Sequence, residues 1–172
     1  ADDPQTGTVI VVSKPPDEGV LAEIRSHADA LGLQVHWAIL GVGRPDLTAS
    51  VESALAALGR SVPGWPAHVA QPEPAGTSQG PALRGLFCGG TLADEAMIVA
   101  ADLLADPIRS NIAHDDGLRV DGHARVDGHL VIDFGDDAMT EGRAHPMIDP
   151  SLRLERISAE AADPTCGVLL LD

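Results

Sequence analysis

Short apolar runs alternate along the chain with segments in which apolar residues recur every three or four positions. The runs Thr8–Ser13 and Val35–Leu40 predict two strands, because apolar and β-branched residues fill both faces. Each run is followed by a predicted amphipathic helix, one ending near Gly32 and the other at Gly59; their apolar positions are Val20, Leu21, Ile24, Ala28 and Leu31, and Leu47, Val51, Ala54, Leu55 and Leu58. This β-α-β-α order predicts a parallel sheet with right-handed crossovers, with Thr8–Ser13 as a central strand.

The pattern stops between Pro63 and Pro81, where five prolines and three glycines occur with almost no apolar periodicity. Such a composition is typical of a linker or a long surface connection. We therefore expect a first lobe over residues 1–62, a linker over 63–82 and a second lobe over 83–172, truncated at its C-terminus.

The strand and helix pattern resumes in the second lobe. The sequence predicts strands at Leu83–Cys88, Leu130–Phe134 and Gly167–Leu171. It predicts a helix from about residue 92 to 104, and a second one that begins at the capping pair Asp149-Pro150 and carries Leu152, Ile157 and Ala161. The expected fold class is therefore α/β.

Two glycines join the strand Leu83–Cys88 to the helix that follows it. Gly89 and Gly90 let the backbone approach a ligand closely, and the N-terminus of a helix presents free N–H groups to an anion. Thr91 and Asp94 match a helix-capping signature. The pattern predicts a turn that binds phosphate or carboxylate; an ordinary capped strand-to-helix turn is the alternative.

A dense polar cluster follows the strand Leu130–Phe134, at the end where open α/β sheets bind ligands; it contains Asp136, Asp137, Thr140, Arg143, His145 and Asp149. His145 is the candidate catalytic residue, as a general base or a phosphate partner, and Arg143 is suited to clamp an anionic substrate. In the alternative interpretation Asp149 only caps a helix, Arg143 forms a salt bridge and His145 is a hydrogen-bond donor in a loop.

Residues 120–129 repeat the motif Val-Asp-Gly-His in tandem. The Asp-Gly pairs are turn signals and predict a polar loop or a small hairpin. The neighbouring imidazoles and carboxylates also raise a metal-site hypothesis, on His114, His123 and His129 with Asp115, Asp116, Asp121 and Asp127. Their spacing matches no established ligand motif, so a solvated loop is favoured and no metal is expected.

The composition narrows the classes of partner. The formal net charge of −15 argues against nucleic acid and anionic membrane surfaces, both of which require basic patches. No apolar stretch reaches the length of a transmembrane helix, and no signal-peptide pattern opens the chain.

Cys88 and Cys166 have no metal-binding or redox spacing, which predicts a cytoplasmic protein with reduced thiols. Cys88 lies beside Gly89, where a buried thiol is favoured over a reactive one.

Three segments carry a family resemblance. Residues 85–96, Gly-Leu-Phe-Cys-Gly-Gly-Thr-Leu-Ala-Asp-Glu-Ala, and residues 133–150, Asp-Phe-Gly-Asp-Asp-Ala-Met-Thr-Glu-Gly-Arg-Ala-His-Pro-Met-Ile-Asp-Pro, resemble FdrA-type proteins of the acyl-CoA synthetase superfamily, as does the Ser-Lys-Pro-Pro segment at 13–16. The resemblance implies two flavodoxin-like, Rossmann-type lobes with three αβα layers, similar to the ligase lobes of succinyl-CoA synthetase. It also implies CoA or a nucleotide as cofactor and acyl or phosphoryl transfer as chemistry.

The resemblance leaves three functions open. The chain departs from true synthetases at residues 41–48, Gly-Val-Gly-Arg-Pro-Asp-Leu-Thr, where the phosphorylated histidine of the family is absent. The first hypothesis is a ligase-lobe portion that binds a small anionic substrate through Gly89, Gly90, Thr91, Arg143, His145 and Asp149. The others are a carbamoyl-transfer subunit of purine (oxamate) catabolism and a noncatalytic scaffold, assembled as a homo-oligomer or with partner subunits.

Overall fold

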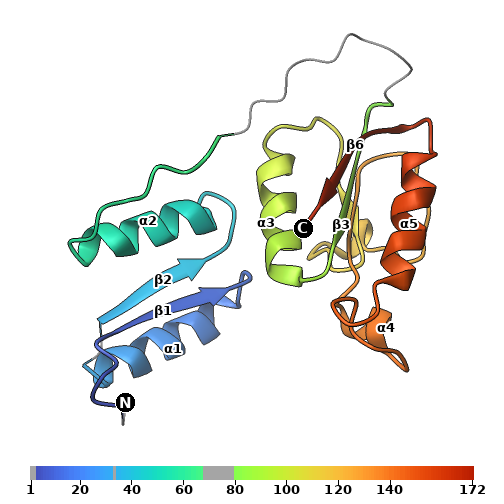
Figure 1. Ribbon diagram of the computed structural model, residues 1–172. Helices are drawn as coiled ribbons and strands as arrows, with labels where there is room; N and C mark the ends of the chain where they lie inside the picture. Colours follow the sequence, from blue (N-terminus) through green and yellow to red (C-terminus); the bar gives the residue numbers. More distant parts are fainter. Residues whose placement is uncertain (1–2, 33, 68–79) are drawn as a thin grey trace. The chain divides into compact units, whose positions relative to one another are not determined.

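The computed structural model describes residues 3–32, 34–67 and 80–172, and the chain divides into two compact units, Ala1–Val69 and Ala70–Asp172 (Figure 1). Residues 68–79 of the predicted linker lie outside the described residues. Both units alternate strands with helices, and all strand pairs among the described residues are parallel. The predicted α/β fold class, flavodoxin-like and Rossmann-type, is confirmed.

The first unit contains the predicted β-α-β-α run, with its strands paired in parallel; its elements are β1 (Thr8–Ser13), α1 (Glu18–Ala30), β2 (Gln34–Ile39) and α2 (Leu47–Ala57). Both helices begin at an aspartate. The Asp17 carboxylate accepts hydrogen bonds from two backbone N–H groups of the first turn of α1, and Asp46 accepts one at the start of α2. Such caps satisfy N–H groups that have no partner within the helix.

The prediction of a central strand at Thr8–Ser13 was wrong. In the described part of the chain β1 pairs with β2 alone. The side chains of Ile10 and Val12 are 43% and 52% exposed. An apolar run on both faces indicates a strand of a parallel sheet, but it does not specify how many neighbours the strand has.

The second unit contains a four-stranded parallel sheet in the order β4-β5-β3-β6. Its elements are β3 (Ala82–Phe87), α3 (Gly90–Ala101), β4 (Arg109–Ser110), the short 3-10 helix η1 (Asp116–Leu118), β5 (Leu130–Asp133), α4 (Asp137–Thr140), α5 (Ser151–Ala161) and β6 (Cys166–Leu171). The three predicted strands are confirmed to within one residue at each end. The short strand β4 was not predicted, because two residues give no periodic signal.

Helices α3 and α5 cover opposite faces of this sheet, which gives the unit three layers (Figure 1). Leu86 and Ile132 point to one face and belong to a buried cluster that Ile157 of α5 contacts. Val131 points to the other face, in a cluster that Met97 of α3 contacts. The alternation of neighbouring residues 131 and 132 between the two faces is the period-two pattern of a strand buried on both sides.

The tandem motif at 120–129 is a loop, so the hairpin alternative was wrong. Two arginines, one buried and one partly buried, hold this loop against the sheet. Arg84 of β3 donates to the carbonyl oxygens of Val126 and Gly128, and Arg156 of α5 donates to those of Gly122 and Ala124. The backbone of the loop therefore satisfies its carbonyl groups with side chains instead of a strand partner.

Glu160 links the two arginines. Its carboxylate lies 2.8 Å from Nε of Arg84 and 2.5 Å from Nε of Arg156. Arg84 is fully buried, and Glu160 is 5% exposed. We call Arg84, Arg156 and Glu160 the arginine cluster. Burial of these charges is tolerable because each guanidinium meets both a carboxylate and backbone carbonyls.

Candidate functional site

The connections of the second sheet change direction between β3 and β5. These strands are neighbours, yet the chain leaves β3 into α3 on one face and leaves β5 towards α5 on the other. Open α/β sheets bind ligands in the crevice outside the carboxyl ends of such a strand pair. We call the residues that follow β3 and β5 here, Cys88–Thr91 and Phe134–His145, the carboxyl edge.

Gly89 is the N-cap of α3, and no side chain caps this helix. A Cβ atom on Gly89 would meet no other atom within 4 Å, so the space beside the N-terminus of α3 is open. The capping signature predicted from Thr91 and Asp94 was wrong, because Thr91 lies inside the first turn of the helix. Asp94 is buried, and its carboxylate lies 3.2 Å from Nε2 of His114.

The loop after β5 passes very close to the end of β3. A Cβ on Gly135 would lie 2.6 Å from the carbonyl oxygen of Cys88 and 2.9 Å from Nε2 of His145. These distances are too short for any side chain, so glycine is required at 135. The contact brings His145 next to Cys88, the residue that precedes Gly89, although His145 and Cys88 are 57 positions apart in the sequence.

Arg143 and Asp149, the remaining predicted site residues, are exposed. Asp149 was predicted to cap the last helix, but α5 begins at Ser151 with Pro150 as its N-cap. The Asp149 carboxylate instead accepts hydrogen bonds from the hydroxyl and the N–H of Ser151, at 2.5 and 3.1 Å. These bonds hold the pKa of Asp149 below its ordinary value, and the charge of Arg143 lowers this pKa further.

Sequence reasoning missed an ion pair at the same end of the sheet. The carboxylate of Asp172, directly after β6, accepts hydrogen bonds from the N–H of Cys88 at 2.9 and 3.1 Å. Arg153 of α5 donates to Asp172 at 2.6 Å and to the carbonyl oxygen of Leu86 at 2.8 Å. Asn111, after β4, bonds the backbone of Asp133. A sequence signal existed, since polar residues just after strands gather at the carboxyl ends of a parallel sheet.

Cys88 lies at the carboxyl edge but is poorly suited to act as a nucleophile. Burial raises the pKa of its thiol, and this effect outweighs the opposing charge of Arg153. The thiol is therefore protonated at neutral pH, whereas the thiolate is the reactive form.

Two histidines of the metal-site hypothesis, His129 and His114, contact different partners. His129 is buried, and its Nδ1 accepts a hydrogen bond from the N–H of Leu83 at 3.0 Å. His114 contacts Asp94 instead. Within the described ranges, no three or more His, Cys, Asp or Glu side chains form a group that could hold a metal ion. The same part of the chain holds no helix with the length and apolar character needed to cross a membrane.

Comparison with known proteins defines the class to which the chain belongs. Residues 86–172, half of the chain, match the model of the CoA-ligase family, and the chain is a member of that family. The matched segment contains all six predicted site residues. The resemblance to the acyl-CoA synthetase superfamily, which includes succinyl-CoA ligase-like proteins, is confirmed at this level.

One relative aligns with nearly the whole chain. The chain is 34% identical over 188 residues to the uncharacterized protein YahF of Escherichia coli (strain K12). The alignment covers 99% of this chain and 36% of YahF, so the chain spans about a third of its relative. No solved structure matches the chain.

Proposed function

We propose that this chain is the ligase-lobe portion of an FdrA-like acyl-CoA synthetase homologue, whose carboxyl edge binds an anionic phosphate or carboxylate group. The observation that carries the proposal is the contact between Gly135, Cys88 and His145. It joins the histidine of one predicted ligand-binding segment to the glycine turn of the other, at the topological switch point of the sheet.

The N-terminus of α3 is the anion-binding part of this proposal. Its first N–H groups have no intrahelical partner and no side-chain cap, and the space beside Gly89 is open. N–H groups and the helix dipole at such an end favour a negative group. In a chain of net charge −15 these local groups must overcome the overall charge.

His145 and Arg143 complete the proposed site from the loop after β5. His145 is half-buried, and its Nδ1 accepts a hydrogen bond from the N–H of Met147 at 3.3 Å. Nε2, which lies against Gly135, is the nitrogen that faces the end of β3. With Nδ1 as the acceptor, the neutral ring carries its proton on Nε2, so we assign His145 the role of a phosphate partner that donates from Nε2, and Arg143 that of an exposed clamp for the anion.

CoA and a nucleotide both suit these groups, because each carries phosphates that an uncapped helix N-terminus can bind. CoA would supply a thiol that carries the acyl group as a thioester. The part that we assign to this chain is to bind and orient the anionic group and to hold a proton at His145.

Thermal unfolding of the full 172-residue chain tests the proposal, with CoA, ATP, inorganic phosphate and carbamoyl phosphate each titrated separately. A ligand that binds only the folded state raises Tm. We expect at least one of the four to raise Tm, and His145→Ala to weaken its affinity about tenfold, because a charge-assisted hydrogen bond is lost. His27→Ala, an exposed histidine of α1, is the matched control and should behave as wild type.

The four ligands also separate the related functions. A response to carbamoyl phosphate alone would favour the carbamoyl-transfer subunit, and a response to CoA would favour acyl transfer. Flat responses to all four ligands, or equal responses in wild type and His145→Ala, would contradict the proposed site. The noncatalytic subunit is the second candidate, favoured by the absence of a histidine in residues 41–48.

A further inference from the structure

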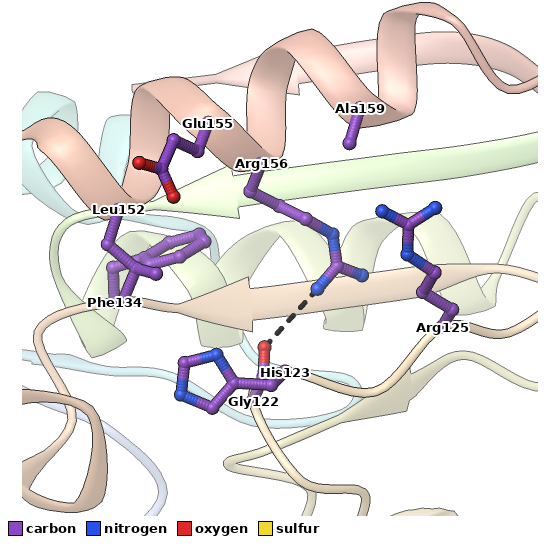
Figure 2. A pocket seen from close by; sticks show the side chains of 8 residues that line it. All are labelled: Gly122, His123, Arg125, Phe134, Leu152, Glu155, Arg156 and Ala159. Atoms are coloured by element: carbon purple, nitrogen blue, oxygen red, sulfur yellow. Dashed lines mark hydrogen bonds between the residues drawn. The ribbon is translucent and has the colours of Figure 1, made fainter.

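A small pocket lies between α5 and the tandem loop, and Phe134 is the one lining residue that it shares with the carboxyl edge. Its volume is about 160 Å³, enough for a ligand of roughly five to ten non-hydrogen atoms. Figure 2 shows its lining, which consists of Gly122, His123 and Arg125 of the loop, Phe134 after β5, and Leu152, Glu155, Arg156 and Ala159 of α5. The tandem motif, which has no role in the proposed function, therefore forms one wall.

Two guanidinium groups point into this space (Figure 2). That of Arg156 is fixed, because it bonds Glu160 at 2.5 Å and the carbonyl oxygens of Gly122 and Ala124 at 3.3 and 2.8 Å. Arg125 is exposed and forms no hydrogen bond or ion pair with any other residue that the structure describes, although its charge helps to lower the pKa of Asp163. Its donors are therefore available to an anion, in a pocket whose second cation is already held in place.

The other residues that line the pocket favour some classes of anion over others. Phe134, Leu152 and Ala159 offer apolar surface, which favours a ligand with a hydrocarbon part. Glu155 adds a negative charge to the lining, which disfavours dianions such as phosphate. We propose that this pocket binds a short-chain monocarboxylate, with its carboxylate on Arg125 and its hydrocarbon chain against Phe134 and Leu152. The proposal is independent of the proposed function.

Four probes of similar size test the class of ligand by thermal unfolding of the full chain. Butyrate is the expected ligand, butylamine carries the opposite charge, 1-butanol carries no charge, and inorganic phosphate has no hydrocarbon part. We expect butyrate to raise Tm in a saturable manner and butylamine and butanol to leave it unchanged at the same ionic strength. Because phosphate can bind at the carboxyl edge, any rise that it causes should be the same in wild type and in Arg125→Gln. An equal rise with butylamine or butanol, or a phosphate response that Arg125→Gln removes, would contradict the proposal.

Variants locate the binding. Arg125→Gln should weaken butyrate binding about tenfold, because it removes a charged hydrogen-bond donor. Ala159→Leu should weaken it similarly by filling the pocket. Arg60→Gln, an exposed arginine of the first unit, and Arg119→Gln, an exposed arginine of the second unit outside the pocket, control for net charge. A loss of affinity in Arg143→Gln would instead place butyrate at the carboxyl edge.

Both controls should bind butyrate as wild type does. Far-UV circular dichroism verifies that each variant folds. If Arg125→Gln and Ala159→Leu fold and still bind butyrate with unchanged affinity, the pocket is not the binding site.

Discussion

The arginine cluster and the carboxyl edge of the second unit use polar groups in opposite ways. In the arginine cluster, Arg84 is buried and Arg156 is partly buried, and both guanidinium groups are bonded to Glu160 and to backbone carbonyls. At the carboxyl edge, Arg143 is exposed and Gly89 has open space beside it. The charged groups of the arginine cluster find their hydrogen-bond partners within the protein, whereas the carboxyl edge leaves polar groups available to a ligand.

This difference teaches which charged residues to assign to function. A buried ion that lacks partners is very costly, so the chain surrounds Arg84 with acceptors and uses it to hold the tandem loop. Groups at the edge are solvated and need no partner for the fold. Changes in the arginine cluster should therefore alter stability, and changes at the edge should alter binding.

The largest effect should come from Arg84→Met. It leaves Glu160 with one arginine and removes the donors from the carbonyl oxygens of Val126 and Gly128. We expect a loss of about 3–5 kcal/mol in the free energy of unfolding of the second unit. Urea unfolding followed by far-UV circular dichroism measures it. The matched variant Arg143→Met, at an exposed position, should stay within about 0.5 kcal/mol of wild type. Similar losses in both would erase the distinction between the two regions.

A smaller effect is expected from Gly89→Ser, which should raise the stability of the protein and weaken its binding of the anion. The backbone at 89 is extended, at φ −156° and ψ 131°, and no side chain caps α3. A serine there can accept a hydrogen bond from the first turn, so we expect a gain of about 0.5–1 kcal/mol in stability. The same bond competes with an anion, so the rise of Tm with ligand should shrink. A variant that is more stable and responds fully to ligand would argue against the helix N-terminus as the site.

The smallest effect concerns the thiol at the carboxyl edge. Burial raises the pKa of Cys88, so folding favours its protonated form. Its contribution to stability is present below the pKa of the unfolded state and is lost as pH rises through the raised pKa of the folded state. In a Cys166→Ser variant we expect iodoacetamide to modify Cys88 several-fold more slowly at pH 7.5 than it modifies the unfolded chain. Modification as fast as that of the unfolded chain would show that the Cys88 thiol is available for reaction in the folded protein.

The local elements of the fold could be predicted from the sequence because they depend on nearby residues. Thr8–Ser13 forms the predicted strand, and the two predicted amphipathic helices that follow the first strands form as α1 and α2. The capping errors have a local cause as well. Thr91 is the second residue of α3, since Gly89 already provides the extended residue that begins the helix.

The proximity of candidate site residues could be predicted only in part. Both segments of the proposed site were identified, since each follows a strand. Arg153 and Asp172 were missed because their pairing depends on α5 and β6 meeting at the end of β3. The role of Arg84 was missed because its partners are more than 40 positions away in the sequence. The role of an arginine in a buried strand can be predicted only when such partners are known.

The sequence by itself determined the alternation of strands and helices, the α/β class and the three segments that carry the family resemblance, since hydrophobic periodicity and turn residues act over short distances. Only the tertiary structure decided the strand order, the burial of Arg84 and the position of His145 beside Cys88. These depend on which distant segments meet, and that choice is made by the packing of both faces of the sheet and by the need to pair every buried charge.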